Sequence, residues 1–376
     1  MKIIKATEKY EDWLGDRIPL IQEDLELKHE YMASDLYDFM RATFYRWIQI
    51  WLENFGDLDS APVVLAVGDL HTENFGTWRD VEGRLIWGIN DFDEAYLLPY
   101  TFDLVRLATS AYMAISEDDS SIEMQFISNA ILAGYRKGLK SGGEPYVLAE
   151  YNTWLRDLML ESLKDPLDFW EKLDMLPTLK ENLPQEAKQA LENTLPRPKI
   201  RYRPAHRTAG LGSLGRRRYV ALIKLCRSYA AREVKELTAS ACLWALGDKG
   251  SSTIFYTNIL NNAVRCPDPF LKVFDRWVAR RLSPDYSRVE LTSLSENNLY
   301  KLLEAMGWET ANVHLGSEAD VIKEVLKDLK NREEDWLSKA AEKMWEVTSD
   351  DFNDWQDYWE GQVIEPTFRR LEIDKE

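Results

Sequence analysis

A short apolar run at residues 63–67 leads directly into Gly68-Asp69, and the next residues include His71 and Asn74. Two kinds of phosphate chemistry begin in this way. In a metallophosphoesterase, a Gly-Asp-x-His segment supplies the first metal ligands. In a kinase-type catalytic loop, Asp-x-x-x-x-Asn supplies a general base and a magnesium ligand. The rest of the sequence has to distinguish the two.

The histidine count argues against the metallophosphoesterase. A two-metal site of that kind needs several His and carboxylate ligands, which usually include a Gly-Asn-His segment. The chain has four histidines, and none of them follows Gly-Asn. They are His29, His71, His206 and His314. Two of these lie in segments with a helical pattern, so the sequence disfavours a histidine-rich metal centre.

The kinase-type interpretation requires a second strand that ends in an acidic residue, and the segment 83–93 fits. Its apolar residues predict a strand at 83–90, which is followed by Asp91 and Asp93. Phosphoryl transfer needs a divalent metal, a base for the incoming hydroxyl and donors along the phosphates. We therefore expect Asp69 to be the base, and Asn74, Asp91 and Asp93 to be the Mg²⁺ ligands.

Two plainer interpretations of the same residues stay open. The acidic cluster could be an ordinary polar turn at a strand end, or a weak calcium site formed by Asp91, Asp93 and Glu94. His71 is expected to order the loop rather than to take part in chemistry. The spacing of the loop and the second strand together favours the phosphate site over these alternatives.

A Gly-rich loop at 210–215, "GLGSLG", supplies candidate phosphate donors. Dinucleotide-binding folds require a helix directly after such a loop, but the following "RRRYVALIKL" is typical of a strand. We therefore expect a β-hairpin flap, with Lys235 about one strand later. The residues predicted to bind ATP are Gly210, Gly212, Ser213, Gly215 and Lys235. Lys235 could instead be an exposed lysine at a strand edge.

The loop lies in a basic stretch of an acidic protein. The formal net charge is −17, yet no carboxylate occurs between Glu192 and Glu233, where arginines and lysines are frequent. Such a stretch faces either an anionic ligand or the acidic surface of the protein itself. The overall charge and the lack of interleaved aromatic residues argue against nucleic-acid binding.

The elements that would position these residues follow from periodicity. Helical spacing of apolar residues predicts helices at 34–54, with Ser34 as N-cap, and at 100–115 and 122–139. Residues 147–192 are helical and Leu-rich, 201–236 are strand-like, and 297–361 are helical. We expect a helical catalytic lobe at 1–194, a β-rich nucleotide-binding lobe at 195–296, and C-terminal helices at 297–376 that complete the helical lobe.

Composition is consistent with a globular protein that does not span a membrane. The 376 residues are 45% hydrophobic and 12% aromatic, and no apolar stretch approaches the roughly 20 residues that cross a bilayer. No signal peptide is evident at the N-terminus. The three cysteines lack Cys-x-x-Cys spacing, which fits a reducing cytoplasm with buried thiols.

The motifs together resemble the bacterial proteins grouped as domain of unknown function 2252. The similar segments are "KHEYMASDLYDFMRATF" (28–44), "GDLHTENFG", "NDFDEAYLLPYTFDLVRLATS", "RTAGLGSLGRRRYVAL" and, more weakly, "LLEAMGWETANVHLGS". They place Arg41, Asp103 and Arg106 at family positions. The resemblance implies an α+β, protein kinase-like bilobal fold, similar to aminoglycoside phosphotransferases in its catalytic segment.

The order of these motifs differs from that of an ordinary kinase, since Asp69 and Asp91 precede Gly210 and Lys235. Either the Gly-rich segment is an unrelated turn, or the chain is a circular permutant whose nucleotide lobe is inserted. For the permutant we expect one cleft lined by Asp69, Asn74, Asp91 and Lys235, with the Gly-rich loop as its lid. The function expected from the resemblance is ATP- and magnesium-dependent phosphoryl transfer to a small-molecule or protein hydroxyl. A pseudokinase or nucleotide-binding module, or an AMP transferase on the same fold, is the alternative.

Overall fold

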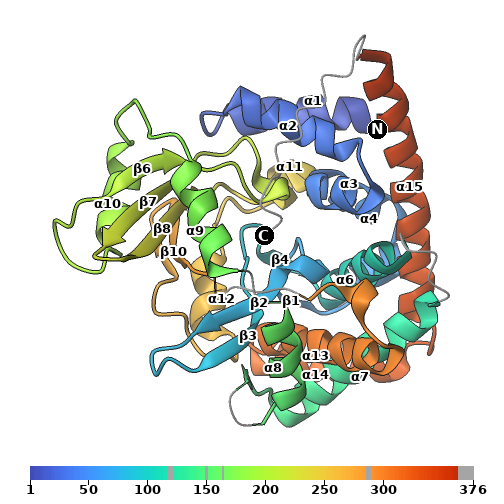
Figure 1. Cartoon of the computed structure of the whole chain (residues 1–376). Helices are drawn as coiled ribbons and strands as arrows, with labels where there is room; N and C mark the ends of the chain where they lie inside the picture. Colours follow the sequence, from blue (N-terminus) through green and yellow to red (C-terminus); the bar gives the residue numbers. More distant parts are fainter. Residues whose placement is uncertain (117–121, 149–150, 163–164, 285–288, 363–376) are drawn as a thin grey trace.

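The computed structural model describes residues 1–116, 122–148, 151–162, 165–284 and 289–362, and it shows a mixed α+β protein (Figure 1). The first half holds helices α1 (Ile3–Gly15), α2 (Gln22–Met32), α3 (Leu36–Ala42), α4 (Phe44–Asn54), α5 (Gly56–Asp59), α6 (Tyr100–Ser116), α7 (Met124–Ser141), α8 (Thr153–Glu161), α9 (Pro166–Met175) and α10 (Gln185–Glu192). Later helices are α11 (Ala241–Leu246), α12 (Tyr256–Asn262), α13 (Glu296–His314), α14 (Ala319–Asn331) and α15 (Trp336–Gln362).

A five-stranded antiparallel sheet occupies one side of the molecule, on the left in Figure 1. Its strands are β6 (Arg203–His206), β7 (Arg218–Leu225), β8 (Ser228–Glu236), β9 (Lys272–Phe274) and β10 (Trp277–Leu282), in the spatial order β6-β7-β8-β10-β9. The predicted strands at 201–236 are therefore confirmed as β6, β7 and β8.

The apolar run in β7 is explained by helices on both faces of this sheet. Successive side chains of a strand point to opposite faces. Tyr219 and Ala221 pack with α10, whereas Val220 and Leu222 pack in a separate cluster with α9. A strand buried on both faces reads as a continuous apolar segment instead of an alternating one.

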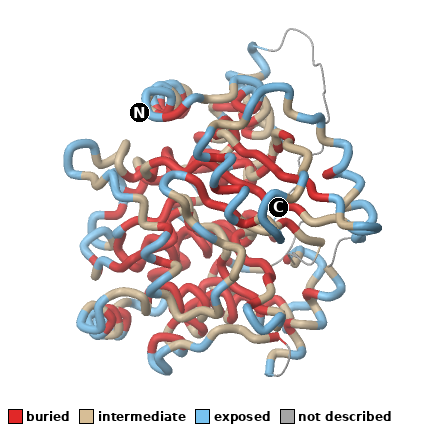
Figure 2. Tube along the Cα trace, turned by 90° about the vertical axis from the view of Figure 1, so that its left-hand side faces the viewer, coloured by how far each residue is buried: buried red, intermediate tan, exposed pale blue. Residues whose placement is uncertain are grey.

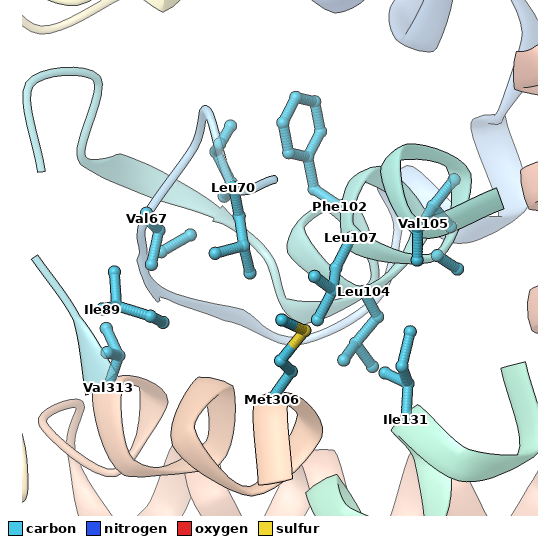
Figure 3. Packing of buried hydrophobic residues seen from close by; sticks show 14 of the residues in the cluster. Val67, Leu70, Ile89, Phe102, Leu104, Val105, Leu107, Ile131, Met306 and Val313 are labelled. Carbon is cyan, nitrogen blue, oxygen red and sulfur yellow. The ribbon is translucent and has the colours of Figure 1, made fainter. Parts of the chain in front are cut away.

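The remaining helices form the largest core. Its centre lies directly under the motif that contains Gly68, Asp69, His71 and Asn74, called the opening motif below. Figure 3 shows Val67 and Leu70 of that motif above side chains from α6, α7 and α13, with Met306 and Val313 contributed by α13. Helix α13 packs along α7, and α15 packs along α6. The C-terminal helices thus complete the core begun by the N-terminal half, and Figure 2 shows buried segments continuing through the interior.

Two smaller sheets flank the opening motif. Strand β1 (Val63–Ala66) pairs with β4 (Tyr96–Pro99), and β2 (Phe75–Arg79) pairs with β3 (Leu85–Ile89), which in turn pairs with β5 (Tyr146–Val147). The expected strands at 63–67 and 83–90 are present as β1 and β3. They do not pair with each other, because β2 forms directly after the motif and takes the edge of β3.

The predicted helix at 34–54 is two helices, and its N-cap is Asp35, whose side chain accepts from the Asp38 N–H. The break falls at Thr43, which has φ −116° and ψ 36°. The Thr43 hydroxyl donates to the carbonyl of Phe39 at 2.7 Å and thereby competes with the helical backbone hydrogen bond. The helical spacing of apolar residues continues across Thr43, so the sequence pattern did not predict this break.

The packing also divides the chain differently from the expected boundary at 194. Helices α9 and α10 cover the five-stranded sheet, although they precede that boundary. Conversely, Ala241 and Cys242 of α11 and Tyr256 of α12 pack in the large helical core, although they follow it. Local helical pattern cannot show which layer a helix covers. Among the described residues, no helix is long and apolar enough to cross a membrane.

Candidate active site

The turn that presents Asp69 is held by a buried carboxylate on α6. Asp103 accepts the backbone N–H of Val67 at 2.7 Å and that of Gly68 at 2.9 Å. It also lies 3.0 Å from Nε2 of His314, whose Nδ1 faces the hydroxyl of Tyr135 at 2.8 Å. These five groups form one hydrogen-bonded chain, so α6, α7 and α13 jointly fix the start of the loop that carries Asp69.

Gly68 is required by the shape of this turn. Its φ is +82°, and an added Cβ would lie 2.3 Å from the carbonyl oxygen of Glu94. A side chain at position 68 would therefore meet both an unfavourable backbone conformation and a steric clash. The turn places Asp69 against α6 instead of continuing β1.

The fully buried Arg106 donates two hydrogen bonds to one carboxylate oxygen of Asp69. The Arg106 Nε lies 2.8 Å from Asp69 Oδ1, and Nη2 contacts the same oxygen. The guanidinium lies over the rings of Phe44 and Trp47, at 4.9 and 4.7 Å from their centroids. Burial raises the pKa of Asp69 above its ordinary value, although Arg106 opposes this effect. The other oxygen, Oδ2, faces Gly212.

Asn74 and His71 close the loop after Asp69 as a reciprocal cap of the 3-10 turn Thr72–Asn74. The His71 N–H donates to Asn74 Oδ1 at 2.7 Å, and the Asn74 N–H donates to the His71 carbonyl at 3.0 Å. The expectation that His71 orders the loop agrees with this geometry. A carbonyl oxygen has two lone pairs, so Oδ1 of Asn74 retains capacity for one further ligand.

Lys235 reaches from β8 to the two carboxylates that follow β3. Its Nζ is 3.1 Å from Asp91 Oδ2 and 2.6 Å from Asp93 Oδ2. The Lys235 side chain is 6% exposed, whereas that of Asp91 is 37% exposed. Lys235 is therefore paired in the interior and is not the exposed edge lysine of the alternative interpretation.

The carboxylates of Asp91 and Asp93 are close enough for each to change the pKa of the other. Burial would raise the pKa of Asp91, but the ammonium of Lys235 and a hydrogen bond with Asp93 hold that pKa below its usual range. Burial and the charge of Asp91 raise the pKa of Asp93 to about 6. Oδ1 of Asp93 is buried and has no hydrogen-bond partner among the described residues.

A bound cation would satisfy that buried oxygen. Mg²⁺ is usually held by one or two carboxylates together with phosphate oxygens and waters. The pair Asp91 and Asp93 fits such a partial donor set, with Lys235 between the carboxylates in this structure. Across the described ranges, no group of three or more His, Cys, Asp or Glu side chains is arranged so that it could hold a metal ion.

The Gly-rich segment is the connection of a hairpin, as expected. It joins the antiparallel strands β6 and β7 through a 3-10 turn at Leu211–Ser213. Gly212 lies over the loop that carries Asp69: a Cβ there would be 3.1 Å from the Arg41 carbonyl and 3.4 Å from Asp69 Oδ2. Ser213 Oγ accepts from Arg218 at 2.9 Å. The flap therefore lies against the loop that carries Asp69.

One cavity of about 80 Å³ lies between the flap, the catalytic loop and the residues after β3. Its lining includes Asp69, Asn74, Asp91, Asp93, Gly210, Gly212 and Ser213. Lys235 is not among the lining residues, although it pairs with Asp91 and Asp93, which are. Gly215 does not line the cavity, because it faces Leu25 instead. Ordinary ligand pockets enclose about 300–1,000 Å³, so a nucleotide would need the flap to open.

The basic stretch mostly pairs with carboxylates of the protein. Arg207 and Arg218 bind Glu233, at 2.6 and 2.8 Å. Arg217 binds Glu236 at 2.6 Å, and Arg216 binds Glu94 at 2.7 Å. The alternative of self-pairing is correct for these four arginines, which rigidify the flap and its strands.

Sequence reasoning missed three cations that line the cavity: Lys28, Arg41 and Arg280. Arg41 had been placed at a family position without a role, and it bridges Asp38 and Glu73 at 3.0 and 2.8 Å. A charged residue inside the apolar run at 39–44 was the signal that could have identified Arg41, since such residues are rarely buried without a partner. No comparable signal marks Lys28, because it shares a face of α2 with Asp24.

Comparison with known proteins gives one family match, which lies in the first half of the chain. Residues 20–199 match the model of a family described as "Uncharacterized protein conserved in bacteria (DUF2252)". The match supports the resemblance to this uncharacterised bacterial family, and it includes Asp69, Asn74, Asp91 and Asp93. No curated protein and no solved structure matches the chain.

Proposed function

We propose that this chain is an ATP- and magnesium-dependent phosphotransferase that acts on a hydroxyl group of a small molecule or a protein. The observation that carries the proposal is the convergence of Asp69, Asp91, Asp93 and the Gly-rich flap on one cavity, with Lys235 ion-paired to both aspartates. These groups come from segments far apart in sequence. Together they supply a base, two anionic metal ligands and cationic phosphate donors.

In the proposed reaction, Asp69 accepts the proton of the incoming hydroxyl through Oδ2. Its Oδ1 is held by Arg106, which fixes the carboxylate in one orientation. The hydroxyl oxygen then forms a bond to the terminal phosphorus of ATP, and the bond to the bridging oxygen breaks, so that ADP leaves. The raised pKa of Asp69 suits this role, because a base works best when its pKa approaches the working pH.

The same geometry suggests how ATP would be held. When bound, Mg²⁺ neutralises negative charge on the phosphates. Asp91 and Asp93 would hold it, with Asn74 as a third oxygen donor. Lys235 would exchange its carboxylate partners for phosphate oxygens, and the backbone of Gly210–Ser213 would cover the phosphate chain.

We further propose that the fold is a circularly permuted kinase-like arrangement. The support is that the five-stranded sheet, at residues 203–282, lies between two stretches whose helices share one core. An insertion of this kind is physically tolerated where it leaves each core intact. Helix α13, from the "LLEAMGWETANVHLGS" segment, contacts the catalytic loop through His314 and Asp103.

One observation favours a nucleotide-binding module without turnover as the second candidate. The Lys235 ammonium lies between Asp91 and Asp93, and the cavity of about 80 Å³ is closed by the flap. A protein that binds a nucleotide to change the position of the flap, with no transfer, would have the same arrangement.

Thermal unfolding with nucleotides tests the proposal. Since a ligand at 100 times its Kd adds about 2.7 kcal/mol to stability, saturating MgATP should raise the melting temperature clearly. ATP with excess EDTA should not. Mass spectrometry of bacterial extracts incubated with the protein and isotopically labelled ATP would then separate transfer of phosphate, transfer of AMP and no transfer. If no purine nucleotide with Mg²⁺ or Mn²⁺ shifts the melting curve, the proposal is wrong.

A further inference from the structure

Helix α2 straps the Gly-rich flap onto the catalytic loop. The Ile21 N–H, just before α2, donates to the Gly215 carbonyl at 2.9 Å. Asp24 accepts the Thr208 hydroxyl at 3.0 Å and lies 3.0 Å from Nε2 of His206. One turn later, at i+4 on the same face of α2, comes Lys28. The strap therefore holds both ends of the flap and carries a lysine to its centre.

Lys28 is a buried cation at the cavity wall. It is 3% exposed, and its Nζ lies 3.4 Å from the Gly212 carbonyl and 5.7 Å from the centroid of the Tyr45 ring. Within the described residues, no carboxylate forms an ion pair with its Nζ. Glu11, the nearest acid on the adjacent helix that influences it, is paired with His29 at 2.7 Å.

The other cations at this cavity differ from Lys28 in having carboxylate partners. Those cations are Arg41 with Asp38 and Glu73, Arg216 with Glu94, and Arg218 and Arg280 with Glu233. Lys28 thus contributes positive charge that Glu11, Glu94 and Asp69 influence only at longer range, without a direct ion pair in the described part of the chain.

An uncompensated buried ammonium is costly, so its retention needs a physical reason. Burial lowers the pKa of Lys28 to about 8, which leaves the side chain largely protonated at neutral pH. A cation in that state, with one weak carbonyl contact and the ring of Tyr45 nearby, is ready to accept an anion without breaking an existing ion pair.

We propose that Lys28 binds a phosphate group of the nucleotide, as a second ammonium that reaches the cleft from α2 while Lys235 reaches it from β8. This inference rests on the proposed function for the identity of the ligand. It assigns to α2 a direct role in ligand binding: opening of the strap would release the flap and withdraw Lys28, and closing would bring both onto the phosphates.

The test measures binding of magnesium tripolyphosphate, MgATP and adenosine to the full chain by titration calorimetry. Lys28→Met keeps an unbranched apolar side chain that is one atom shorter, and it removes the charge. We expect at least a 10-fold loss of affinity for tripolyphosphate and for MgATP, as expected for one hydrogen bond to a charged group, and no loss for adenosine. Lys28→Arg should restore most of the affinity. Lys9→Met, at an exposed position of α1, is the matched control and should bind like wild type.

Unfolding of the unliganded variants separates ligand binding from a structural role. Because Lys28 is an unpaired buried charge, Lys28→Met should melt at the same temperature as wild type or higher. Lower melting with unchanged tripolyphosphate affinity would make Lys28 structural and overturn the inference. If tripolyphosphate binding depends on Lys28 but no nucleotide binds, the anion site stands and the proposed function falls. If wild type binds neither, both fall.

Discussion

Arg106 of α6 and Asp69 of the catalytic loop form a buried ion pair, with Nε 2.8 Å from Oδ1. The same guanidinium donates from Nη2 to the Met40 carbonyl of α3 at 3.1 Å and lies between two aromatic rings of α4. One side chain therefore ties the candidate base to three helices. This arrangement leaves Oδ2 of Asp69 directed at the flap, where a substrate hydroxyl would have to lie.

The first prediction concerns this pair. Arg106→Met should destabilise the protein by about 3–5 kcal/mol, because it leaves the buried Asp69 carboxylate without a counter-charge. Urea unfolding followed by circular dichroism measures the effect. Arg197→Met, at an exposed position, is the control and should change stability by no more than about 0.5 kcal/mol. Equal unfolding midpoints for the two variants would show that the pair contributes little.

The second prediction separates the roles of the two acidic segments. Asp91→Ala should abolish Mg²⁺-dependent nucleotide binding, because it removes an anionic ligand. Asp69→Asn should preserve binding and reduce turnover by at least about 100-fold, because the shape remains and the base is lost. Binding is measured by calorimetry, and turnover with the acceptor found by mass spectrometry. Asp320→Ala, whose side chain is 88% exposed on α14, is the control. Full turnover by Asp69→Asn would make Asp69 structural.

The third prediction is a bell-shaped pH dependence of MgATP binding. The pKa of Asp93 is raised to about 6, so below that pH a proton competes with the metal, and binding strengthens as pH rises through 6. The pKa of Lys28 is lowered to about 8, so binding weakens again as pH rises through 8 and its charge is lost. Calorimetry between pH 5 and about 9.5 measures both limbs, which lie within the buffers usable with this method.

Matched variants assign each limb of that profile. Asp93→Asn should remove the acidic limb while it weakens binding at all pH values, and Lys28→Met should remove the alkaline limb. Asp91 and Arg216 face Asp93 and keep their charges across this range, because the pKa of Asp91 is lowered and that of Arg216 is raised; they should not produce either limb. A profile that is flat in wild type would contradict the assignment of both groups.

The fourth prediction uses two glycines with similar backbone conformations. Gly68 and Gly83 have φ of +82° and +76°, but an added Cβ meets the Glu94 carbonyl at 2.3 Å only at Gly68, and nothing within 4 Å at Gly83. Gly83→Ala should cost about 1–2 kcal/mol from the left-handed conformation alone. Gly68→Ala should cost clearly more and should displace Asp69, so that activity falls as well. Chemical unfolding of the two variants side by side measures the difference. Equal losses in the free energy of unfolding would mean that the Glu94 backbone can move away from the added Cβ at little cost.

Much of the candidate site was predictable, because the sequence features that indicate it lie close together in the chain. An apolar strand that stops at Gly68-Asp69, a cap residue five positions after Asp69, and two aspartates after the next strand are all visible within about 30 residues. The hairpin at Gly210–Gly215 was also predictable, because β-branched and aromatic residues lie on both sides of it. Helix boundaries were less accurate: the hydroxyl of Thr43 breaks the helix at 34–54 without any change in apolar periodicity.

The sequence by itself determined which residues of the two loops could bear chemistry, because residue type and spacing decide what a loop can donate, accept or bind. Only the tertiary structure decided which of them meet. Asp69 and Arg106 are 37 positions apart, Lys235 and Asp91 are 144 apart, and Lys28 and Gly212 are 184 apart. These pairs depend on how α6, β8 and α2 pack around one cavity, and packing is set by complementary shapes across the whole core, which no short pattern encodes.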